Sequence, residues 1–268
     1  MNLMLIGCGN IGSALLNLWA PFNLFNRIIV VQPSMSSAHR FRNKVAIEFV
    51  ESMDAIDQNF SADLTVLAIK PQTINKVMTA LAQRSHDSII VSLLAGIKLS
   101  QLTAFMLDNS RIARIMPNIA IKTGQSVNLA FSAQSLSVED VNRIERVFKS
   151  SGSMIWVKKE NDLDILTPIS GSGPAYFFLL AETLVAEVMK LGIDENMARK
   201  LVQHVFLGSA SLVAENKNFE ALITSVASKK GVTEAALTVM EPNFKKIMQE
   251  SLKAAQIRLK ELSNENCC

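Results

Sequence analysis

Three glycines near the start of the chain have the spacing G-x-G-x-x-G, between an apolar, strand-like segment at 2–6 and a helical pattern at 13–20. At such a junction the first glycine permits a tight turn, the second lets a pyrophosphate approach the backbone, and the third lets helix and strand pack closely. The helix N-terminus adds free N–H groups and positive dipole. Glycines also gather in ordinary turns, but this context favours dinucleotide binding. The residues expected at the pyrophosphate are Gly7, Gly9, Asn10, Ile11 and Gly12.

The residues that follow the next apolar run, 28–31, bear on which dinucleotide binds. An acid about 20 residues past the glycines would bind the ribose hydroxyls and select NAD, but Gln32 and Ser34 stand there instead. A 2′-phosphate then meets no repulsion, and His39, Arg40 and Arg42 follow closely enough to bond it. The sequence favours NADPH, with Gln32 and Ser34 among its contacts. NADH stays possible, with the arginines as ordinary solvated helix residues.

Three further loops are expected beside the glycine loop, because the carboxyl ends of parallel strands meet at one edge of a sheet. They lie at residues 70–72, 95–96 and 116–118, and each ends an apolar run. Each has the composition of a plain turn, yet three in this layer favour a nicotinamide pocket. The residues expected to line it are Ala68, Lys70, Pro71, Ala95, Gly96, Met116 and Asn118.

Two later segments place small, flexible residues before a helix. Residues 170–176 read SGSGPAY, and residues 228–233 read SKKGVT. Backbone N–H groups at a helix N-terminus attract carboxylates, and Lys229 and Lys230 add positive charge to the second segment. The competing interpretation is a simple N-cap role for Ser172 and Thr233.

The elements that position these loops alternate between strand and helix. Nearly continuous apolar strands indicate a parallel sheet covered on both faces. The expected strands are residues 2–6, 28–31, 64–69, 89–94, 112–116, 127–131 and 154–157. The expected helices between them are residues 13–20, 36–44, 73–83, 100–107 and 138–149. We predict an α/β Rossmann fold with a mostly parallel, doubly wound sheet, forming an NAD(P)-binding domain at 1–160.

Residues 161–268 have a helical period and are predicted to form an all-α domain. Helices are expected at 175–191, 194–213 and 234–240, followed by a last amphipathic helix with Phe244, Met248 and Leu252 on one face. The segment 175–189 is apolar on nearly all sides, so it must be buried all round. We expect a second chain to complete its burial. A helix sandwiched within its own chain is the alternative.

Composition excludes several classes of protein. The net charge of +3 and the scarcity of aromatic residues (6%) argue against a nucleic-acid surface. The three cysteines and three histidines form neither a disulfide framework nor metal-ligand spacing, and the cysteines indicate a reducing compartment. The segment 175–189 contains Glu182 and Glu187 and is shorter than the about 20 residues of a membrane span. We expect a cytoplasmic protein without metal, membrane or nucleic-acid partners.

Five motifs together resemble the pyrroline-5-carboxylate reductase family over nearly the whole chain. They are GCGNIG at 7–12, AIKPQ at 68–72, SLLAGI at 92–97, RIMPN at 114–118 and SGSGPAY at 170–176. The last is the most specific, since generic Rossmann proteins lack it. The resemblance implies reduction of (S)-1-pyrroline-5-carboxylate to L-proline with NAD(P)H, the last step of proline biosynthesis. It also implies a helical dimerisation domain after the Rossmann domain, in homodimers that often assemble into decamers.

The family also has a late S-P-G-G-T-T loop, whose backbone amides hold the substrate carboxylate and whose final Thr contacts the ring nitrogen. The matching segment here is 228–233. The residues that agree with the motif are Ser228, Gly231 and Thr233, and those that differ are Lys229, Lys230 and Val232. The family's M-P-N-T-P reads MPNIA at 116–120, and a usual basic–acidic pair is replaced by Ile223 and Thr224. These departures surround the substrate, and a lysine at 230 is disfavoured if φ is positive there.

The resemblance and the residues together give a predicted site. Thr233 and Lys70 are expected to be catalytic. No His or Glu stands out as the proton donor, so the proton source stays open and water is one candidate. The residues expected at the substrate are Ser228, Lys229, Lys230, Gly231, Val232, Thr233, Asn118 and Ser172. One alternative is a related NADP-dependent imine or keto-acid reductase with another substrate. The other is an NADPH-binding regulatory protein without turnover.

Overall fold

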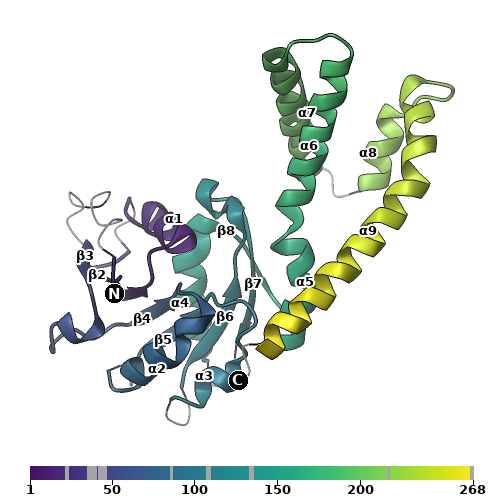
Figure 1. Ribbon diagram of the computed structural model, residues 1–268. Coiled ribbons are helices and arrows are strands. Elements are labelled where there is room, and N and C mark those ends of the chain that lie inside the picture. Colours follow the sequence, from purple (N-terminus) through teal and green to yellow (C-terminus); the bar gives the residue numbers. More distant parts are fainter. Residues whose placement is uncertain are drawn as a thin grey trace. The chain divides into compact units, whose positions relative to one another are not determined.

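The fold of the chain is given by a computed structural model, which describes residues 1–21, 24–34, 41, 47–84, 87–106, 110–132, 136–215 and 218–265 (Figure 1). It separates into two compact units. One is Met1–Ser172 with Gln256–Cys268, and the other is Gly173–Ala255. The domain boundary expected after residue 160 stays a prediction.

The centre of the first unit is an eight-stranded sheet in the order β3-β2-β1-β4-β5-β6-β7-β8. Its strands are β1 Asn2–Ile6, β2 Arg27–Val31, β3 Ile47–Val50, β4 Leu64–Leu67, β5 Ile89–Ser92, β6 Ile112–Met116, β7 Ser126–Ser132 and β8 Gly152–Trp156. Neighbouring strands pair in parallel, except that β7 runs antiparallel to β6. The predicted α/β class with a mostly parallel sheet is confirmed, and each predicted strand is present.

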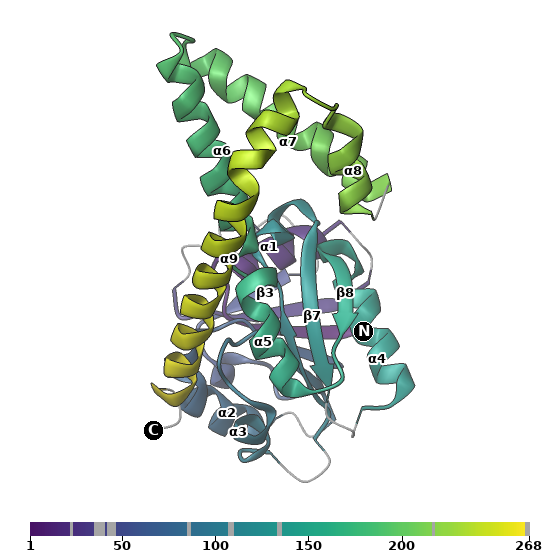
Figure 2. The ribbon, with the colours of Figure 1, turned by 90° about the vertical axis from the view of Figure 1, so that its right-hand side faces the viewer.

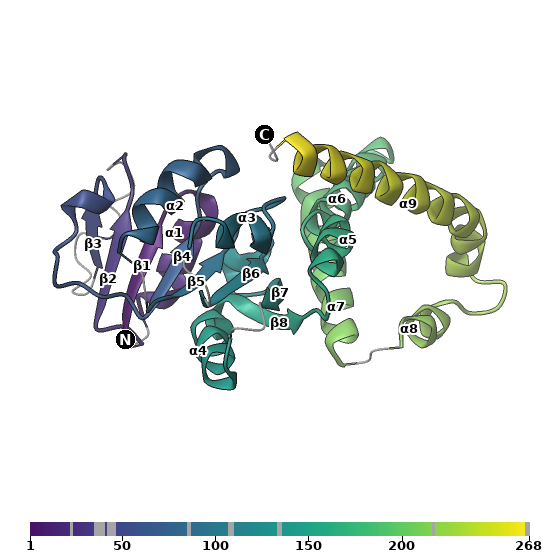
Figure 3. The ribbon, with the colours of Figure 1, turned by 90° about the horizontal axis from the view of Figure 1, so that it is seen from below.

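Helices cover both faces of this sheet. They are α1 Asn10–Trp19, α2 Ile74–Ala82, α3 Leu99–Thr103, α4 Val138–Phe148 and α5 Glu160–Ser170, with short 3-10 turns η2 Met53–Ala55, η3 Pro71–Thr73, η4 Ile119–Thr123 and η5 Lys149–Ser151. Along β1, Leu3 and Leu5 pack in the layer of α1 and α4, whereas Met4 and Ile6 pack in the layer of α2 and α3. Figure 3 shows α2 and α3 on the opposite side of the sheet from α4. Successive side chains of a strand point to opposite faces, so a strand that is covered twice must be apolar throughout.

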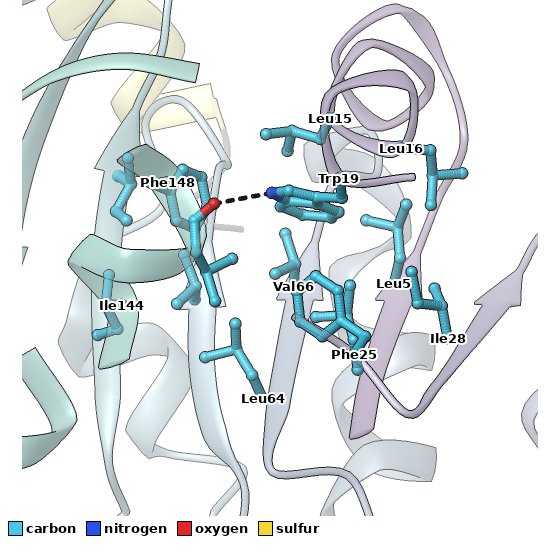
Figure 4. Close-up of a cluster of buried hydrophobic side chains, with 14 of the residues drawn as sticks. Leu5, Leu15, Leu16, Trp19, Phe25, Ile28, Leu64, Val66, Ile144 and Phe148 are labelled. Atoms are coloured by element: carbon cyan, nitrogen blue, oxygen red, sulfur yellow. Dashed lines mark hydrogen bonds between the residues drawn. The ribbon is translucent and has the colours of Figure 1, made fainter. Parts of the chain in front are cut away.

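Trp19 fixes α1 within its layer (Figure 4). The side chain is fully buried, and its Nε1 donates to the backbone oxygen of Val147 at 2.9 Å. Its ring meets Phe25 and Phe148 edge-on, at centroid distances of 5.8 and 6.0 Å. Buried indole N–H groups require a partner, so this bond ties the end of α1 to the end of α4.

Three elements of the first unit differ from expectation. β3 was not predicted, because this edge strand leaves Glu48 exposed and Ile47 and Phe49 only half-buried, which breaks the apolar run. The expected helix at 36–44 lies outside the described residues, apart from Phe41. The expected helix at 100–107 is the shorter α3, which ends at Thr103.

The helices of the second unit are α6 Gly173–Lys190, α7 Glu195–Glu215, α8 Phe219–Val226 and α9 Val232–Glu265, the last of which continues beyond it. Val185 of α6 packs with Ala198 and Val202 of α7 in a small core. Arg199 joins the same two helices by donating to Glu182 at 3.1 Å. Hydrogen bonds to Glu182 and, to a smaller extent, to Glu195 raise the pKa of Arg199.

One helix of the second unit was missed, and one helical expectation was wrong. α8 was not predicted, and α9 is one helix across Pro242, where two separate helices were expected. Proline removes a backbone N–H and usually kinks or ends a helix. The side-chain amide of Asn243, the next residue, donates to Val239 O at 2.9 Å, one carbonyl beyond the one that Pro242 leaves without a donor.

Most of α6 lies exposed in the described chain. Phe177, Phe178 and Leu179 are 61, 64 and 69% exposed, so burial of this helix within its own chain is not what the structure shows. By length and composition alone, the stretch Glu160–Lys190 is apolar enough to cross a membrane. That test is weak support for a span here, because α5 and α6 are separate helices within the stretch.

Candidate active site

Gly7 and Gly12 occupy positions that only glycine fits. Gly7 has φ +95°, and a Cβ on it would lie 2.5 Å from the carbonyl oxygen of Ala68. A Cβ on Gly12 would lie 2.3 Å from the carbonyl oxygen of Gly7. The turn after β1 is therefore packed directly between the end of β4 and the first turn of α1.

Gly9 is different, because the space beside it is open. A Cβ on Gly9 would meet no atom within 4 Å, and the residue is exposed. Gly9 is the N-cap of α1 and makes no side-chain cap bond, and the first turn of the helix holds no acidic residue. The start of this helix therefore has open space beside Gly9 and no acidic side chain in its first turn, a combination compatible with an anion such as a phosphate.

Gln32 braces the glycine loop. Its Oε1 accepts the N–H of Cys8 at 2.7 Å, while its own backbone N–H donates to Val50 O at 2.9 Å. Gln32 was expected to contact the ribose. Its side-chain oxygen instead holds the glycine loop, which leaves its side-chain NH2 group at the same edge of the sheet. Ser34 is exposed nearby in the chain, and His39, Arg40 and Arg42 lie outside the described residues.

The segment after β4 begins beside the glycine loop. Ala68 donates its N–H to Ile6 O at 2.8 Å, which keeps it alongside the end of β1. Lys70 is extended, with φ −75° and ψ 141°, and is exposed. Its carbonyl accepts the hydroxyl of Thr73 at 2.8 Å, and Pro71 starts the short turn η3. The strand was expected to reach Ile69 and to end at this proline, but β4 already ends at Leu67, so Pro71 begins the turn rather than ending the strand.

The turn after β5 contains a second glycine with a left-handed backbone. Gly96 has φ +74° and is buried, whereas Ala95 before it is exposed. α3 begins at Leu99, three residues further along. Glycine adopts this left-handed backbone without strain, so the turn brings the small Ala95 side chain to the surface at this edge.

Asn118, after β6, has its side chain turned into the protein. It is 8% exposed, its Oδ1 accepts Ala120 N–H at 3.0 Å, and its Nδ2 donates to Ser170 O at 2.8 Å. Its own N–H donates to the hydroxyl of Ser126 at 3.0 Å. The carboxamide expected to touch cofactor or substrate therefore links the loop to the last residue of α5. Met116, two residues earlier, is half-buried at the end of β6.

A buried ion pair lies just before that loop, and sequence reasoning missed it. Arg114 of β6 is 1% exposed and donates from Nη1 to Glu160 Oε1 at 2.7 Å. Asp164 Oδ1 lies 3.5 Å from its Nη2. The signal that could have revealed it is an arginine inside an otherwise apolar strand, because a buried charge requires a partner.

The loop at 228–233 is a tight turn between α8 and α9. Gly231 donates its N–H to Ser228 O at 2.9 Å, and a Cβ on Gly231 would lie 2.3 Å from the Ser228 hydroxyl. Lys230 has φ +60°, the left-handed region that disfavours a side chain. Its N–H donates to the carboxylate of Glu234 at 2.5 Å. α9 begins at Val232, so the N–H groups of Val232 and Thr233 lie in its first turn.

The segment at 170–173 joins α5 to α6. Ser172 is exposed, and its N–H lies 3.4 Å from Thr167 O. Gly171 donates to the same carbonyl at 2.8 Å. Gly173, the first residue of α6, has no atom within 4 Å of a Cβ built on it. This turn is open on the side of Gly173, and its start is held by Asn118.

The expected cofactor residues gather along one edge of the first unit. They follow β1, β2, β4, β5 and β6, whose order in the sheet is β2-β1-β4-β5-β6. Direct contacts join Gly7 to Ala68 and Cys8 to Gln32. β1 lies between β2 and β4, where the strand order reverses and open α/β sheets bind ligands. The residues at 228–233 belong to the second unit.

Among the residues that the structure describes, no group of three or more Asp, Glu, His or Cys side chains is arranged to bind a metal ion.

Two family models match the chain. The model "Pyrroline-5-carboxylate reductase dimerisation" matches residues 160–262. The model "NADP oxidoreductase coenzyme F420-dependent" matches residues 2–96. The first covers α5 to α8 and most of α9, and the second covers the glycine loop and the turn at 95–96.

The chain is also similar to known proteins over nearly its full length. A pyrroline-5-carboxylate reductase of Haemophilus influenzae is 31% identical over 262 residues, which is 96% of each chain. The structure of a pyrroline-5-carboxylate reductase from Coxiella burnetii has a TM-score of 0.89 at 29% identity, covering 97% of this chain and 98% of that one. A Plasmodium falciparum pyrroline carboxylate reductase, crystallised with NADP bound, has a TM-score of 0.83 at 25% identity and covers 98% of both.

Proposed function

The chain belongs to the pyrroline-5-carboxylate reductase family, and from this premise we propose that it reduces (S)-1-pyrroline-5-carboxylate to L-proline with NADPH. The observation that carries the proposal is the 31% identity over 96% of both chains, because it takes in the α/β unit and the helical unit together. The step would end proline biosynthesis, and we propose that it takes place in the cytoplasm.

The first unit fits the cofactor. We propose that the helix start at Gly9 holds the pyrophosphate, through the backbone of Gly7, Asn10, Ile11 and Gly12. Gln32 and Ser34 stand at the ribose. The residues proposed to line the nicotinamide are Ala68, Lys70, Pro71, Ala95, Gly96, Met116 and Asn118. When bound, NADPH supplies the hydride that the imine carbon receives.

The turn at 228–233 fits the anionic end of the substrate. Its backbone N–H groups start α9, where the helix dipole favours a carboxylate, and Lys229 and Lys230 bring two positive charges. We propose that Ser228, Gly231 and Val232 contribute to this seat, and that Ser172 is a further substrate-binding residue.

Thr233 and Lys70 carry the proposed catalytic roles. The Thr233 hydroxyl hydrogen-bonds the ring nitrogen and so orients the C=N bond, while the Lys70 ammonium lies at the cofactor edge. The reaction adds one hydride to carbon and one proton to nitrogen, so orientation and exclusion of water contribute more than a strong base does. Asn118 acts by holding the loop, since its carboxamide is committed to Ala120 and Ser170.

We further propose that a second copy of the chain covers α6. Phe177, Phe178 and Leu179 are more than half exposed, and the dimerisation model matches the residues that contain them. A homodimer that buries this helix on both sides removes the unfavourable exposure of these side chains. Assembly of dimers into decamers is the further expectation.

One observation favours a second candidate function. Lys230 holds a left-handed backbone in the segment where the family has glycine, next to the proposed carboxylate seat. A related NADP-dependent imine or keto-acid reductase would use the same cofactor edge with a differently shaped seat.

NADPH oxidation by the purified full-length chain tests these proposals. We expect turnover with pyrroline-5-carboxylate that exceeds turnover with a panel of other cyclic imines and 2-keto acids. Preference for another imine or keto acid would favour the second candidate. Tight NADPH binding without turnover on any substrate would contradict both and indicate a regulatory protein.

A further inference from the structure

Glu160, the first residue of α5, contacts two separate parts of the sheet edge. Its Oε1 accepts the N–H of Leu99 at 2.7 Å and Nη1 of Arg114 at 2.7 Å. Leu99 starts α3, three residues after Gly96, and Arg114 lies two residues before Met116. One carboxylate oxygen therefore joins the turn at 95–96 to the strand that leads into the loop at 116–118.

Arg114 depends on this contact. It is 1% exposed, the oxygen of Asp164 is 3.5 Å away, and its Nε has no hydrogen-bond partner within the described residues. A buried guanidinium that loses its closest carboxylate must move or recruit water. Any such movement would shift β6 just ahead of Met116.

The other end of α5 holds the same loop. Ser170 O accepts the side chain of Asn118 at 2.8 Å, and the helix packs along β7 between these two ends (Figure 2). α5 thus bonds the strand before the loop through Glu160 and the loop itself through Ser170. All of these contacts lie within the first unit.

We propose that Glu160 is a positioning residue, which sets the turn at 95–96 against the loop at 116–118 so that both fit the nicotinamide. The inference rests on the proposed function for the identity of the ligand. A positioning role for Glu160 differs from simple stabilisation of the fold. Loss of its hydrogen bonds would change NADPH binding and turnover by more than a lowered stability explains.

The chain offers a matched control on the same strand. Arg111, just before β6, donates to Asp140 Oδ1 at 3.0 Å, and Asp140 is 4% exposed at the start of α4. This second ion pair, partly buried because the Arg111 side chain is 33% exposed, also ties a helix to the residue before β6. It lies at the amino end of the strand, away from the cofactor edge. Asp140→Asn therefore removes the charge of a partly buried pair without touching the two loops.

The experiment compares Glu160→Ala, Glu160→Gln and Asp140→Asn in the full chain. Isothermal titration gives the Kd of NADPH, steady-state kinetics gives kcat and KM for pyrroline-5-carboxylate, and thermal unfolding gives the midpoint. We expect Glu160→Ala to raise Kd and lower kcat by about tenfold each, since misplaced groups lose productive geometry steeply. KM should change by less than about twofold, because removing a positioning contact affects the reactive geometry rather than the carboxylate seat.

Glu160→Gln keeps an acceptor oxygen for Leu99, so it should restore most of the loss, to within about threefold of the wild type in Kd. If Glu160→Ala does not fold, Glu160→Leu, which fills the space without an acceptor oxygen, takes its place in the comparison with Asp140→Asn. Asp140→Asn should leave Kd and kcat within about twofold while lowering the midpoint.

Equal changes in Kd for Glu160→Ala and Asp140→Asn would overturn the inference, as would a Glu160→Ala protein that binds NADPH like the wild type. Failure of the proposed function has a different signature, namely wild-type protein that binds NADPH without reducing pyrroline-5-carboxylate. In that case the Kd comparison still decides the role of Glu160. A wild-type chain that binds no NADPH would overturn both.

Discussion

The glycine loop at 7–12 and the turn at 228–233 use the same device, a helix N-terminus with free backbone N–H groups, but they are built differently. In the first, Gly7 and Gly12 are packed so closely that a Cβ would clash, and only Gly9 is open. In the second, a lysine sits at φ +60° and its N–H is held by the Glu234 carboxylate. Tight packing leaves one residue free for the ligand, whereas the looser turn tolerates substitutions at its centre.

The largest effect is expected from Gly12→Ala. The added methyl group would lie 2.3 Å from Gly7 O, so α1 must move away from the loop. We expect a loss of about 3 kcal/mol in the free energy of unfolding, typical of severe overpacking, together with loss of NADPH binding. Urea unfolding of the variant measures the first quantity. A variant as stable as the wild type would show that this contact is not rigid.

Gly9→Ala should separate binding from folding. Nothing lies within 4 Å of the new methyl group, so the free energy of unfolding should change by less than about 0.5 kcal/mol. The methyl group would project where the pyrophosphate approaches, and we expect the Kd of NADPH to rise by at least about tenfold. Titration calorimetry with NADPH checks this. An unchanged Kd would mean that the phosphates bind elsewhere.

Thr233→Ala tests the second region. Removing the hydroxyl should lower kcat/KM for pyrroline-5-carboxylate by about tenfold, the value of one lost hydrogen bond in the transition state, with NADPH binding unchanged. Thr238→Ala is the matched control, because this exposed threonine lies on the same helix and bonds only Glu234 O at 2.9 Å among the contacts resolved for it. Unaltered steady-state rates in Thr233→Ala would remove this residue from the mechanism.

The smallest effect is expected from Lys230→Gly. Glycine relieves the left-handed strain, which should raise the free energy of unfolding by roughly 0.5–1 kcal/mol. Lys229→Gly is the control, since Lys230 is the one non-glycine residue with positive φ among those that the structure describes. Thermal unfolding compares the two. A destabilised Lys230→Gly would show that the turn does not store the strain assigned to it.

The glycine loop could be predicted from the sequence because neighbouring residues alone determine its conformation. G-x-G-x-x-G between a strand and a helix specifies both the turn and the open residue, and Gly7, Gly9 and Gly12 lie where this reasoning put them. The family and the fold class followed from motifs spread over the chain. Their agreement with the comparisons reflects how many separate loops must match at once.

What the sequence could not give depends on distant contacts. Glu160 meets Leu99 across 61 residues, and Asn118 meets Ser170 across 52, so neither pairing has a local signature. The position of Asn118 was predicted, but the inward direction of its side chain was not. β3 was missed because Glu48 interrupts its apolar pattern. α9 was predicted as two helices because Pro242, which usually ends or kinks a helix, lies between its two halves.

The most direct measurement of the central claim uses NADPH that carries deuterium at the transferred position. The chain is incubated with this cofactor and pyrroline-5-carboxylate, and the product is examined by mass spectrometry. The account predicts L-proline with one deuterium on its ring for each NADPH consumed. Oxidation of NADPH without labelled proline, or no reaction with this substrate, would contradict it.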